Sequence, residues 1–557
     1  MKTVKSKLIT LLLCCVAYCS NVVASESIKF TWRGSTSSTS VTSNKSFDIA
    51  ATDGMQFTVD WGDGSDIETI TGIGNEQNLN HTYVNTNNST TYTVKITGVT
   101  ADCLFTYLNL NNILLTTLDL SANTALQSLY CYYNQLSTLD LNANKLLQTL
   151  NCYNNSLTTL DLSANTQLQS LSCFLNQLTA LDLKANTALE TLICSSNLLT
   201  TLDLSANTLL QEIVCSNNSL TVLDLNTNTV LHTLYCNNNQ FTALDLKTNT
   251  ALETLDCRDN QLTTLELNAN TKLETLDCSN NQLTDLDLST NTLLQNLTCY
   301  NNALNALDLK ANTLLQTLIC SNNHLAFLDT KSQLNSLDVT NNRLLLSDLY
   351  NTTKMMSGTA LIRLGIQILV PQEAIVGSSV DYSAQKEFGG KTTVFTVKKN
   401  GLPALLSSDY TIDDGIITFN NTGNYTVIMT NSATLPLKSS SFAVETTRKF
   451  TTPQPSSVPA EVIAEINVTD GMGVTNTQAA GITIYPNPTS GQLTIDNGQL
   501  KIDNVEIFDV FGRNLTPFPS PIWRGVSEGR GEVDISHLPA GIYYLKVDGK
   551  TTKIIKQ

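Results

Sequence analysis

Ten cysteines follow one another at a constant interval of 21 residues. They are Cys131, Cys152, Cys173, Cys194, Cys215, Cys236, Cys257, Cys278, Cys299 and Cys320. Disulfide frameworks normally have uneven spacings, so this regularity indicates an internal repeat. A unit of 21 residues cannot bury an apolar face by itself, and its copies must therefore stack on one another. The spacing predicts a solenoid.

Each repeat has two similar halves, L-x-x-L-x-C-x-x-N-x and L-x-x-L-D-L-x-x-N-T-x, as residues 126–146 illustrate. Leu129 and Cys131 in the first half, and Leu139 and Leu141 in the second, are two residues apart. This alternation points both side chains of a pair to one face of a short strand. Ten or eleven residues per half leave little room for a helix. The pattern predicts a mostly β fold of about twelve turns, from Leu110 to Val339.

The invariant positions of the repeat have structural explanations. The Leu columns predict the core, and the Cys column adds small buried thiols. Stacked, parallel Cβ vectors fit disulfide geometry poorly, although oxidation of some pairs stays open. A metal site needs convergent ligands, which a straight column does not supply. Two Asn columns, Asn134 to Asn342 and Asn123 to Asn312, are expected to bond backbone groups at the turns.

These motifs carry a family resemblance. L-x-x-L-x-(L/C)-x-x-N is the leucine-rich-repeat pattern, and the 21-residue length with a Cys column resembles the cysteine-ladder repeats of internalin-type bacterial surface proteins. The resemblance covers residues 104–345. It implies a curved solenoid that recognises a macromolecule on one face.

Positions on either side of each Cys vary from turn to turn, because the scaffold does not fix them. Exposed aromatics with a polar rim are typical of recognition surfaces. Neutral variation, with aromatics favoured simply because they suit strands, is the alternative. The candidate ligand-binding residues are Tyr130, Tyr132, Tyr153, Phe174, Tyr235, Arg258 and Tyr300.

The second half-repeat carries an acidic column. Its members are Asp119, Asp140, Asp161, Asp182, Asp203, Asp224, Asp245, Glu266, Asp287, Asp308 and Asp329. We expect a solvated surface that discourages edge pairing. A cation-binding stripe is the alternative, although a full calcium site needs six to eight oxygens.

The N-terminus reads as a signal peptide over residues 1–24, with Lys2, Lys5 and Lys7 before an apolar run and small residues before Ser25. No other stretch approaches the length of a transmembrane helix, so none is expected in the mature chain. The formal net charge of −16 argues against nucleic-acid binding, since such a surface repels phosphates.

Three further segments flank the repeats. Residues 27–100 resemble a polycystic-kidney-disease-type β-sandwich through VDWGDGS (59–65), HTY (81–83) and YTVKITG (92–98). Asp60, Asp63 and Asp66 are weak calcium candidates there, and a turn stabilised by Asp and Gly is the alternative. Residues 346–363 are predicted as a C-terminal cap, 364–449 as an immunoglobulin-like β-sandwich with a tyrosine corner at Tyr425, and 450–480 as a linker.

Residues 481–557 carry a further signature. It consists of IYPNPTSG (484–491), VEIFDVFGR (505–513) and DISHLPAGIYYLKV (534–547). This resembles the type A C-terminal sorting domain of the type IX secretion system of Bacteroidetes-type bacteria. The resemblance implies a small β-sandwich recognised by the outer-membrane translocon, and a protein that is released or attached to the surface.

No catalytic constellation is visible: there are four His, and neither a zinc-type His pair, a Walker loop nor a nucleophile elbow. The sequence therefore predicts a secreted, cell-surface-attached binding protein or adhesin that recognises a host or microbial surface protein or glycan through the solenoid face. No cofactor is expected, with calcium left open. The alternative function is structural surface assembly without a single specific ligand.

Overall fold

The computed structural model describes residues 25–39, 41–330, 333–354, 356, 360–434 and 460–469, and the backbone of further strands between 483 and 556. The predicted signal peptide, 1–24, lies outside the described residues. The chain divides into two compact units. The first contains residues up to 303 together with 310–315, and the second contains 304–309 and the residues from 316 onward.

The first unit begins with a β-sandwich. Its strands are β1 (Ser27–Arg33), β2 (Val41–Ala51), β3 (Gln56–Asp60), β4 (Glu68–Thr71), β5 (Glu76–Thr86) and β6 (Thr91–Gly98). Buried and exposed residues alternate along β1 and β6, so one face of each strand points inward. Phe30 on β1 meets Phe47 on β2 with ring centroids 5.5 Å apart, and Trp32 stacks on Trp61 at 6.3 Å. Aromatic packing therefore joins the two sheets.

This sandwich is continuous with the solenoid. β8 (Leu115–Asp119) pairs antiparallel with β1, and β7 (Phe105–Asn109) pairs antiparallel with β2. β7 also pairs in parallel with the first strand of the repeats. Both sheets of the sandwich thus extend into the first turns, which covers the apolar end of the stack.

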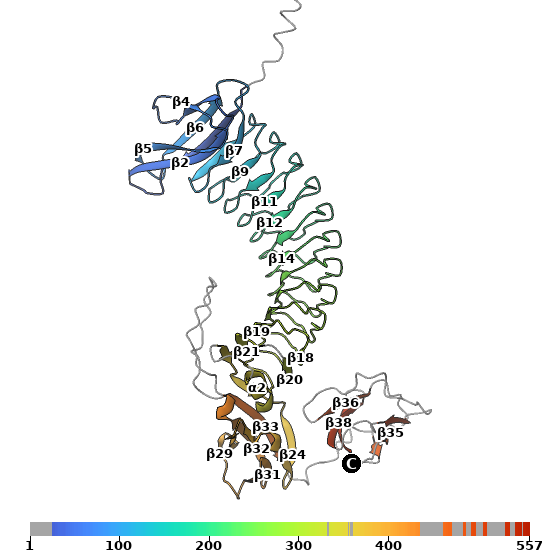
Figure 1. Ribbon diagram of the computed structural model, residues 1–557. Helices are drawn as coiled ribbons and strands as arrows, with labels where there is room; N and C mark the ends of the chain where they lie inside the picture. The colour runs from blue at the N-terminus through green and yellow to red at the C-terminus, as the bar shows by residue number, and fades with distance from the viewer. Residues whose placement is uncertain are drawn as a thin grey trace, which may run out of the picture. The chain divides into compact units, whose positions relative to one another are not determined.

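The repeats of the first unit form a parallel sheet with one short strand per turn (Figure 1). The strands are β9 (Ser128–Tyr130), β10 (Thr149–Asn151), β11 (Ser170–Ser172), β12 (Thr191–Ile193), β13 (Glu212–Val214), β14 (Thr233–Tyr235), β15 (Thr254–Asp256), β16 (Thr275–Asp277) and β17 (Asn296–Thr298). Each residue pairs with its copy 21 positions along, as Leu129 does with Leu150. The sequence period is therefore the register of the sheet.

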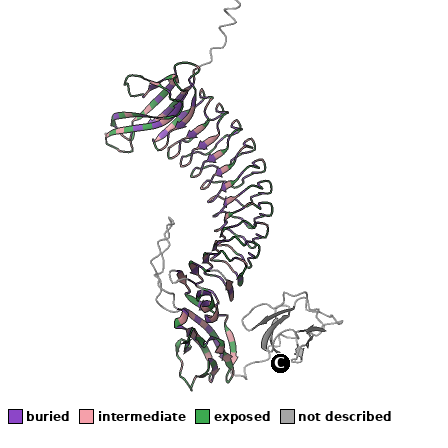
Figure 2. Ribbon diagram, in the orientation of Figure 1, coloured by how far each residue is buried: buried purple, intermediate pink, exposed green. Residues whose placement is uncertain are grey.

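The invariant columns form the interior, as the purple residues of Figure 2 show. Leu129, Leu150 and their copies have no exposed surface, and the ladder cysteines are equally buried. Cys131 to Cys278 and Cys320 are thiols without disulfides. The predicted dry core of Leu and Cys is confirmed.

The Asn columns hold neighbouring turns together as predicted. The side-chain amide of Asn155 donates to the carbonyls of Cys131 and Cys152, both at 3.0 Å, and its oxygen accepts the Leu136 N–H at 2.9 Å. Asn165, in the second column, donates to the carbonyls of Leu141 and Asn144. The first-column amide thus satisfies backbone groups of two successive turns, and the second-column amide satisfies those of the turn before it.

The second unit contains the last repeats. β18 (Ala306–Leu309) pairs with β20 (Phe327–Thr330), while β19 (Thr317–Ile319), β21 (Ser336–Asp338) and β22 (Leu361–Arg363) form a parallel ladder. α2 (Leu346–Thr353) lies within the segment predicted as a cap and buries Leu346 and Leu349. Because β22 adds to the ladder, this segment is part repeat and part helix.

A mainly antiparallel domain follows in the second unit. Its elements are β23 (Ile366–Ile368), β24 (Gln372–Ile375), β25 (Ser379–Asp381), η1 (Ser383–Gln385), β26 (Glu387–Phe388), β27 (Lys391–Thr392), β28 (Val394–Lys399), β29 (Leu402–Pro403), β30 (Tyr410–Asp413), β31 (Ile416–Phe419), β32 (Gly423–Thr430) and η2 (Ser432–Thr434). The hydroxyl of Tyr425 donates to the carbonyl oxygens of Asp409 (3.1 Å) and Asn421 (2.9 Å), the bonding typical of a tyrosine corner.

The linker predicted over 450–480 is wrong for part of its length. Residues Glu461–Thr469 form β33, which pairs antiparallel with β32 and in parallel with β23 and β24. Alternate residues of β33 are buried, among them Val462 and Ala464. The apolar alternation of VIAEINV therefore outweighs the surrounding Thr, Pro and Ser. The rest of the predicted linker, apart from Ala460, lies outside the described residues.

The C-terminal segment has two antiparallel three-stranded sheets. They are formed by β34 (Thr483–Tyr485), β35 (Gln492–Asp496) and β37 (Arg530–Asp534), and by β36 (Val505–Asp509), β38 (Gly541–Val547) and β39 (Lys550–Lys556). In the described part of the chain, no helix is long and apolar enough to cross a lipid bilayer.

Candidate functional site

The sheet face is the solvent-facing side of β9 to β17 together with the residue that follows each Cys. It lines the inner side of the curved row of turns in the first unit (Figure 1). In each strand the central Leu or Ile points inward and is buried, as Leu129 and Ile213 are. The flanking positions must then point outward, since side chains alternate along a strand. This geometry places all seven predicted ligand-binding residues on the sheet face.

Three of these residues stack on one another. The rings of Tyr132 and Tyr153 lie 4.5 Å apart with an interplanar angle of 8°, and those of Tyr153 and Phe174 lie 4.1 Å apart at 12°. All three occupy the same repeat position in successive turns. Stacking follows from the register, because equivalent residues of adjacent parallel strands are about 4.8 Å apart.

Two further tyrosines contact predicted residues, Tyr133 in the stack and Tyr107 beside Tyr130, and neither was predicted as a site residue. Tyr133 packs edge-on against Tyr132 at 5.9 Å and Tyr153 at 5.1 Å. Tyr107 on β7 lies 5.5 Å from Tyr130 on β9. We call Tyr107, Tyr130, Tyr132, Tyr133, Tyr153 and Phe174 the aromatic cluster. Tyr107 was not predicted because it precedes the first ladder cysteine, Cys131, and Tyr133 was not predicted because its position usually holds Asn.

The other predicted residues lie apart from this cluster. Tyr235 belongs to β14, Arg258 follows β15 and Tyr300 follows β17. Tyr235 is 36% exposed, and the hydroxyl of Tyr300 accepts a long 3.4 Å hydrogen bond from the Asn280 amide. The seven predicted residues therefore divide into one aromatic group and three separate positions.

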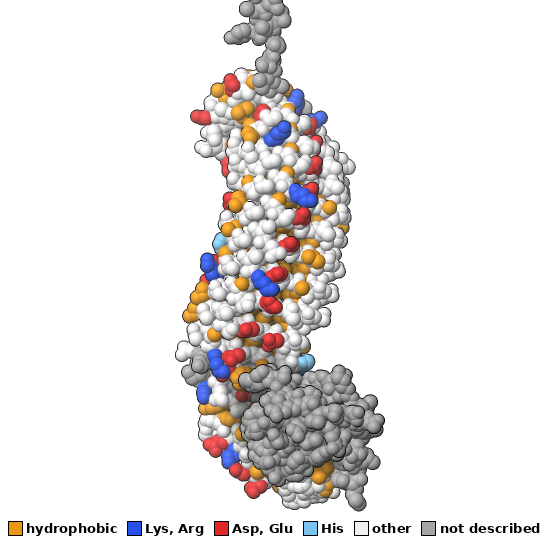
Figure 3. Space-filling model, turned by 90° about the vertical axis from the view of Figure 1, so that its right-hand side faces the viewer, with side chains coloured by type: hydrophobic (Ala, Val, Ile, Leu, Met, Phe, Trp, Pro, Cys, Tyr) orange, Lys and Arg blue, Asp and Glu red, His pale blue; other side chains and the backbone are white. Residues whose placement is uncertain are grey.

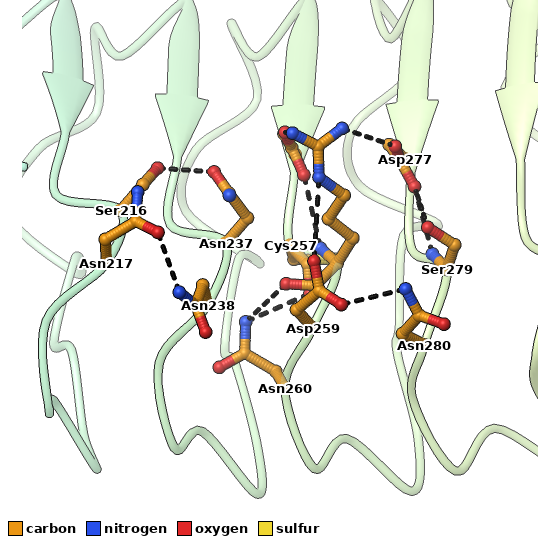
Figure 4. A network of polar contacts seen from close by, with 12 residues as sticks. Ser216, Asn217, Asn237, Asn238, Cys257, Asp259, Asn260, Asp277, Ser279 and Asn280 are labelled. Carbon is orange, nitrogen blue, oxygen red and sulfur yellow. Dashed lines mark hydrogen bonds and ion pairs between the residues drawn. The ribbon is translucent and has the colours of Figure 1, made fainter. Parts of the chain in front are cut away.

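Arg258 is the centre of a charged network. Its guanidinium lies 3.1 Å from Asp277, 3.4 Å from Asp256 and 3.8 Å from Asp259. Asp277 also accepts from Ser279, and Asp259 accepts from Asn280 across the turns (Figure 4). The guanidinium is thus held by three carboxylates of its own surface.

Asp256 and Asp277 are register partners on neighbouring strands. Asp256 is 6% exposed, and its burial, with the repulsion from Asp277, raises its pKa to about 7 in spite of Arg258. Two like charges directly opposite on a sheet destabilise it, and protonation of one of them relieves the repulsion. This part of the sheet face therefore changes charge near neutral pH.

The acidic column of the second half-repeat stabilises turns. Asp161 accepts from the backbone N–H of Ser163 at 2.9 Å, and Asp203 accepts from both the N–H and the hydroxyl of Ser205. These hydrogen bonds lower the pKa of both carboxyls. Lys184 lies 3.6 Å from Asp203. Figure 3 shows acidic side chains recurring along the side turned away from the sheet, with basic ones interspersed.

The calcium candidates of the first sandwich also act in turns. Asp60 accepts from the Gly62 N–H at 2.9 Å. Asp63 accepts from Ser65 and lies 2.8 Å from His81. Burial opposes ionisation of Asp63, but the hydrogen bonds from Ser65 and His81 outweigh it and lower its pKa to about 2. Among the described residues, no group of three or more His, Cys, Asp or Glu is arranged to hold a metal ion.

The comparison with known families gives a match at the C-terminal end of the chain. Residues 483–557 match the family of secretion system C-terminal sorting domains. The predicted sorting domain is therefore confirmed. A comparison with curated proteins gives no match.

Several solved structures are similar to this chain. The functional domain of InlJ from Listeria monocytogenes, which includes a cysteine ladder, is 25% identical over 65% of this chain and 90% of that chain, with a TM-score of 0.43. The internalin InlF of Listeria monocytogenes is 25% identical over 46% and 78%, with a TM-score of 0.43. InlP of the same species is 17% identical over 59% and 90%, with a TM-score of 0.39. The leucine-rich-repeat solenoid itself is established by the strands, columns and register described above.

Proposed function

We propose that this protein is a secreted, cell-surface-attached binding protein that recognises a surface protein or glycan of a host or another microbe through the sheet face of its solenoid. The observation that carries the proposal is the aromatic cluster. Its six rings occupy positions that vary from turn to turn, where other turns hold residues as different as Ile193, Ser195 and Asp256. Aromatic side chains grouped on a rigid surface supply large contact areas at a low entropic cost.

The proposed location rests on both ends of the chain. A signal peptide over 1–24 would direct export from the cytoplasm. The sorting domain would then be recognised by the type IX translocon, which places the protein outside the cell or on the outer-membrane surface of a Bacteroidetes-type bacterium. We propose a non-catalytic role without a cofactor, because the conspicuous groups of the sheet face are rings and paired charges.

The test is binding of the full secreted chain to arrays of glycans and of cell-surface proteins. The variant carries Tyr132→Ser, Tyr153→Ser and Phe174→Ser, and we expect it to lose at least tenfold in affinity for any ligand found. Val222→Ser is the matched control, because Val222 is 71% exposed and belongs to the other half-repeat. Equal binding by the triple variant and the wild type, with circular dichroism unchanged, would remove the sheet face as the ligand site.

Structural surface assembly is the alternative function, and one observation favours it. A single repeat position carries exposed apolar residues in several turns: Leu146, Leu209, Val230, Leu293 and Leu314, each 40–50% exposed. Such a row could join molecules side by side. Sedimentation velocity would reveal concentration-dependent association, which Leu209→Ser with Val230→Ser should abolish if assembly is the function.

A further inference from the structure

One backbone position in every turn of the first unit adopts a left-handed conformation. It is the residue before the first-column Asn in nine turns and Asn112, which precedes Ile113, in the first, and its φ lies between +53° and +56° in these ten successive copies. They are Asn112, Tyr133, Asn154, Leu175, Ser196, Asn217, Asn238, Asp259, Asn280 and Asn301. Asn and Asp tolerate this conformation because their short polar side chains bond locally, whereas larger side chains are strained in it.

Asn is favoured at this position for a second reason. The amide of Asn238 donates to the side-chain oxygen of Asn217 at 2.7 Å, and that of Asn301 donates to Asn280 at 2.7 Å (Figure 4 shows the first). These bonds link neighbouring turns at the surface. An Asn here therefore relieves backbone strain and adds a contact between turns.

Tyr133 and Leu175 lack both the relief of backbone strain and the amide hydrogen bond between turns that Asn provides at this position. Their side chains are 49% and 44% exposed, so core packing does not explain them. Both belong to turns of the aromatic cluster: Tyr133 contacts Tyr132 and Tyr153, and Leu175 directly follows Phe174. Large apolar side chains thus occupy a strained, exposed position next to the stacked rings. Strain that the fold does not require is typical of a functional site.

The geometry of the stack limits which ligand fits. Tyr153 has Tyr132 against one ring face and Phe174 against the other, and Tyr133 approaches at its edge. A sugar ring packs on a free aromatic face, and the middle ring of this stack has none. The stack offers ring edges along its length and ring faces only at its two ends, beside the exposed side chains of Tyr133 and Leu175.

The absence of charged residues from the sheet face in these three turns further limits the chemistry of the partner. Residues 128–133, 149–154 and 170–175 contain no charged residue. A charged group buried against them would lose its hydration without gaining a partner, which is costly. An uncharged apolar surface of a protein would gain from the contact, because burial of apolar area is favourable.

We propose that Tyr133 and Leu175 are ligand-contact residues that extend the aromatic cluster into an anchor for an uncharged, apolar segment of a protein ligand. The inference rests on the proposed function and deepens it, since it names the ligand class and two residues that determine specificity. The strain at both positions is retained because the side chains contact the ligand.

The test uses the full secreted chain, a phage-displayed library of random 12-residue peptides and a glycan array. We expect enrichment of peptides rich in aromatic and aliphatic residues, and no glycan whose binding depends on the cluster. Tyr133→Asn and Leu175→Asn should each weaken binding of a selected peptide at least fivefold, and Leu175→Asn should also raise the midpoint of urea unfolding. A merely structural residue would not lose binding while gaining stability.

Ser196→Asn is the matched control, because it also places Asn at the left-handed position, one turn beyond Leu175 and outside the aromatic cluster. It should raise the unfolding midpoint and leave peptide affinity unchanged. If Tyr153→Ser abolishes peptide binding while both Asn variants bind as well as the wild type, the inference fails and the proposed function stands. If Tyr153→Ser also binds the peptide normally, the proposed function and the inference both fail. If no peptide is enriched, the inference fails. A glycan lost only in the cluster variants would overturn the choice of a protein ligand.

Discussion

The carboxylate of Glu26 accepts a 2.7 Å hydrogen bond from the side-chain amide of Asn123, a residue 97 positions further along the chain. The same carboxylate accepts the backbone N–H groups of Phe105 and Ala125, both at 2.8 Å. In later turns, carbonyl oxygens of the preceding turn accept from the equivalent Asn, as Asn123 does from Asn144. Glu26 therefore takes the place of a preceding turn at the start of the stack.

Replacing Glu26 with Ala should destabilise the first unit by about 2–4 kcal/mol, because two buried donors, on Phe105 and Asn123, and two part-buried ones, on Thr124 and Ala125, would lose their acceptor. Guanidinium unfolding followed by circular dichroism measures the change. Glu68→Ala, at an exposed position on the edge strand β4, is the control and should cost less than about 0.5 kcal/mol. Equal stability of the two variants would mean that the sandwich contacts alone close the stack.

Replacing Asn155 with Ala should cost about 2–4 kcal/mol, since the carbonyls of Cys131 and Cys152 and the Leu136 N–H would be left buried without their partner. Hydrogen exchange should show the loss of protection centred on β9 to β11, because each turn contacts only its neighbours. Thr138→Ala, at an exposed position, should leave exchange unchanged. Uniform destabilisation along the whole stack would contradict this local role.

The buried thiols make the free energy of unfolding decrease at high pH. Burial raises the pKa of Cys131 to about 12, and that of Cys152 is also raised by burial, with repulsion from the neighbouring thiolate adding to it. The unfolded chain loses these protons near pH 9 while the folded chain keeps them, so stability falls as pH rises from about 9 toward 12. Each thiol contributes about 1.4 kcal/mol per pH unit in that window.

The check is the slope of unfolding free energy against pH in the wild type and in a variant with Cys131→Ala and Cys152→Ala. Because other groups also titrate there, the difference between the two slopes isolates the thiols. In the native protein at pH 8 the ladder cysteines should also resist an aromatic disulfide reagent that labels them after denaturation. Rapid labelling of native protein would show that the interior opens readily.

Asp256 makes the stability of the fold depend on pH between about 4 and 7. Its pKa of about 7 in the fold lies above its ordinary value of 3.8, so its contribution to stability is present at low pH and is lost as pH rises from about 4 to 7. Asp256→Asn should therefore gain stability relative to the wild type at pH 8, on the order of 1–3 kcal/mol, and little or nothing at pH 4.

Asp259→Asn is the matched control for Asp256. It removes a carboxylate that faces the same Arg258 but is more exposed, and Asn suits its left-handed backbone. Its stability relative to the wild type should change little between pH 4 and pH 8. If both variants follow the same curve, the repulsion between Asp256 and Asp277 is not the source of the pH dependence.

The stacking of Tyr132, Tyr153 and Phe174 shows that the repeat period predicts contacts between side chains as well as the fold. Residues 21 apart become cross-strand neighbours, so any departure from the repeat that recurs in adjacent turns is a contact in space. Tyr133 and Leu175 were detectable by the same reasoning, since they interrupt a column of Asn. What the sequence did not reveal is that this column is left-handed, because Asn is also common in ordinary turns.

The amino-acid sequence by itself determined the solenoid, its buried Leu, Cys and Asn columns, the aromatic residues of the sheet face and the sorting domain, because local periodicity and short motifs specify them. Only the tertiary structure decided that β1 and β2 continue into the first turns, that Glu26 closes the stack, which strands 461–469 pairs with and that Asp256 is buried against Asp277. Those features depend on pairings between distant or non-repeating segments, and their free energy comes from contacts that no local pattern encodes.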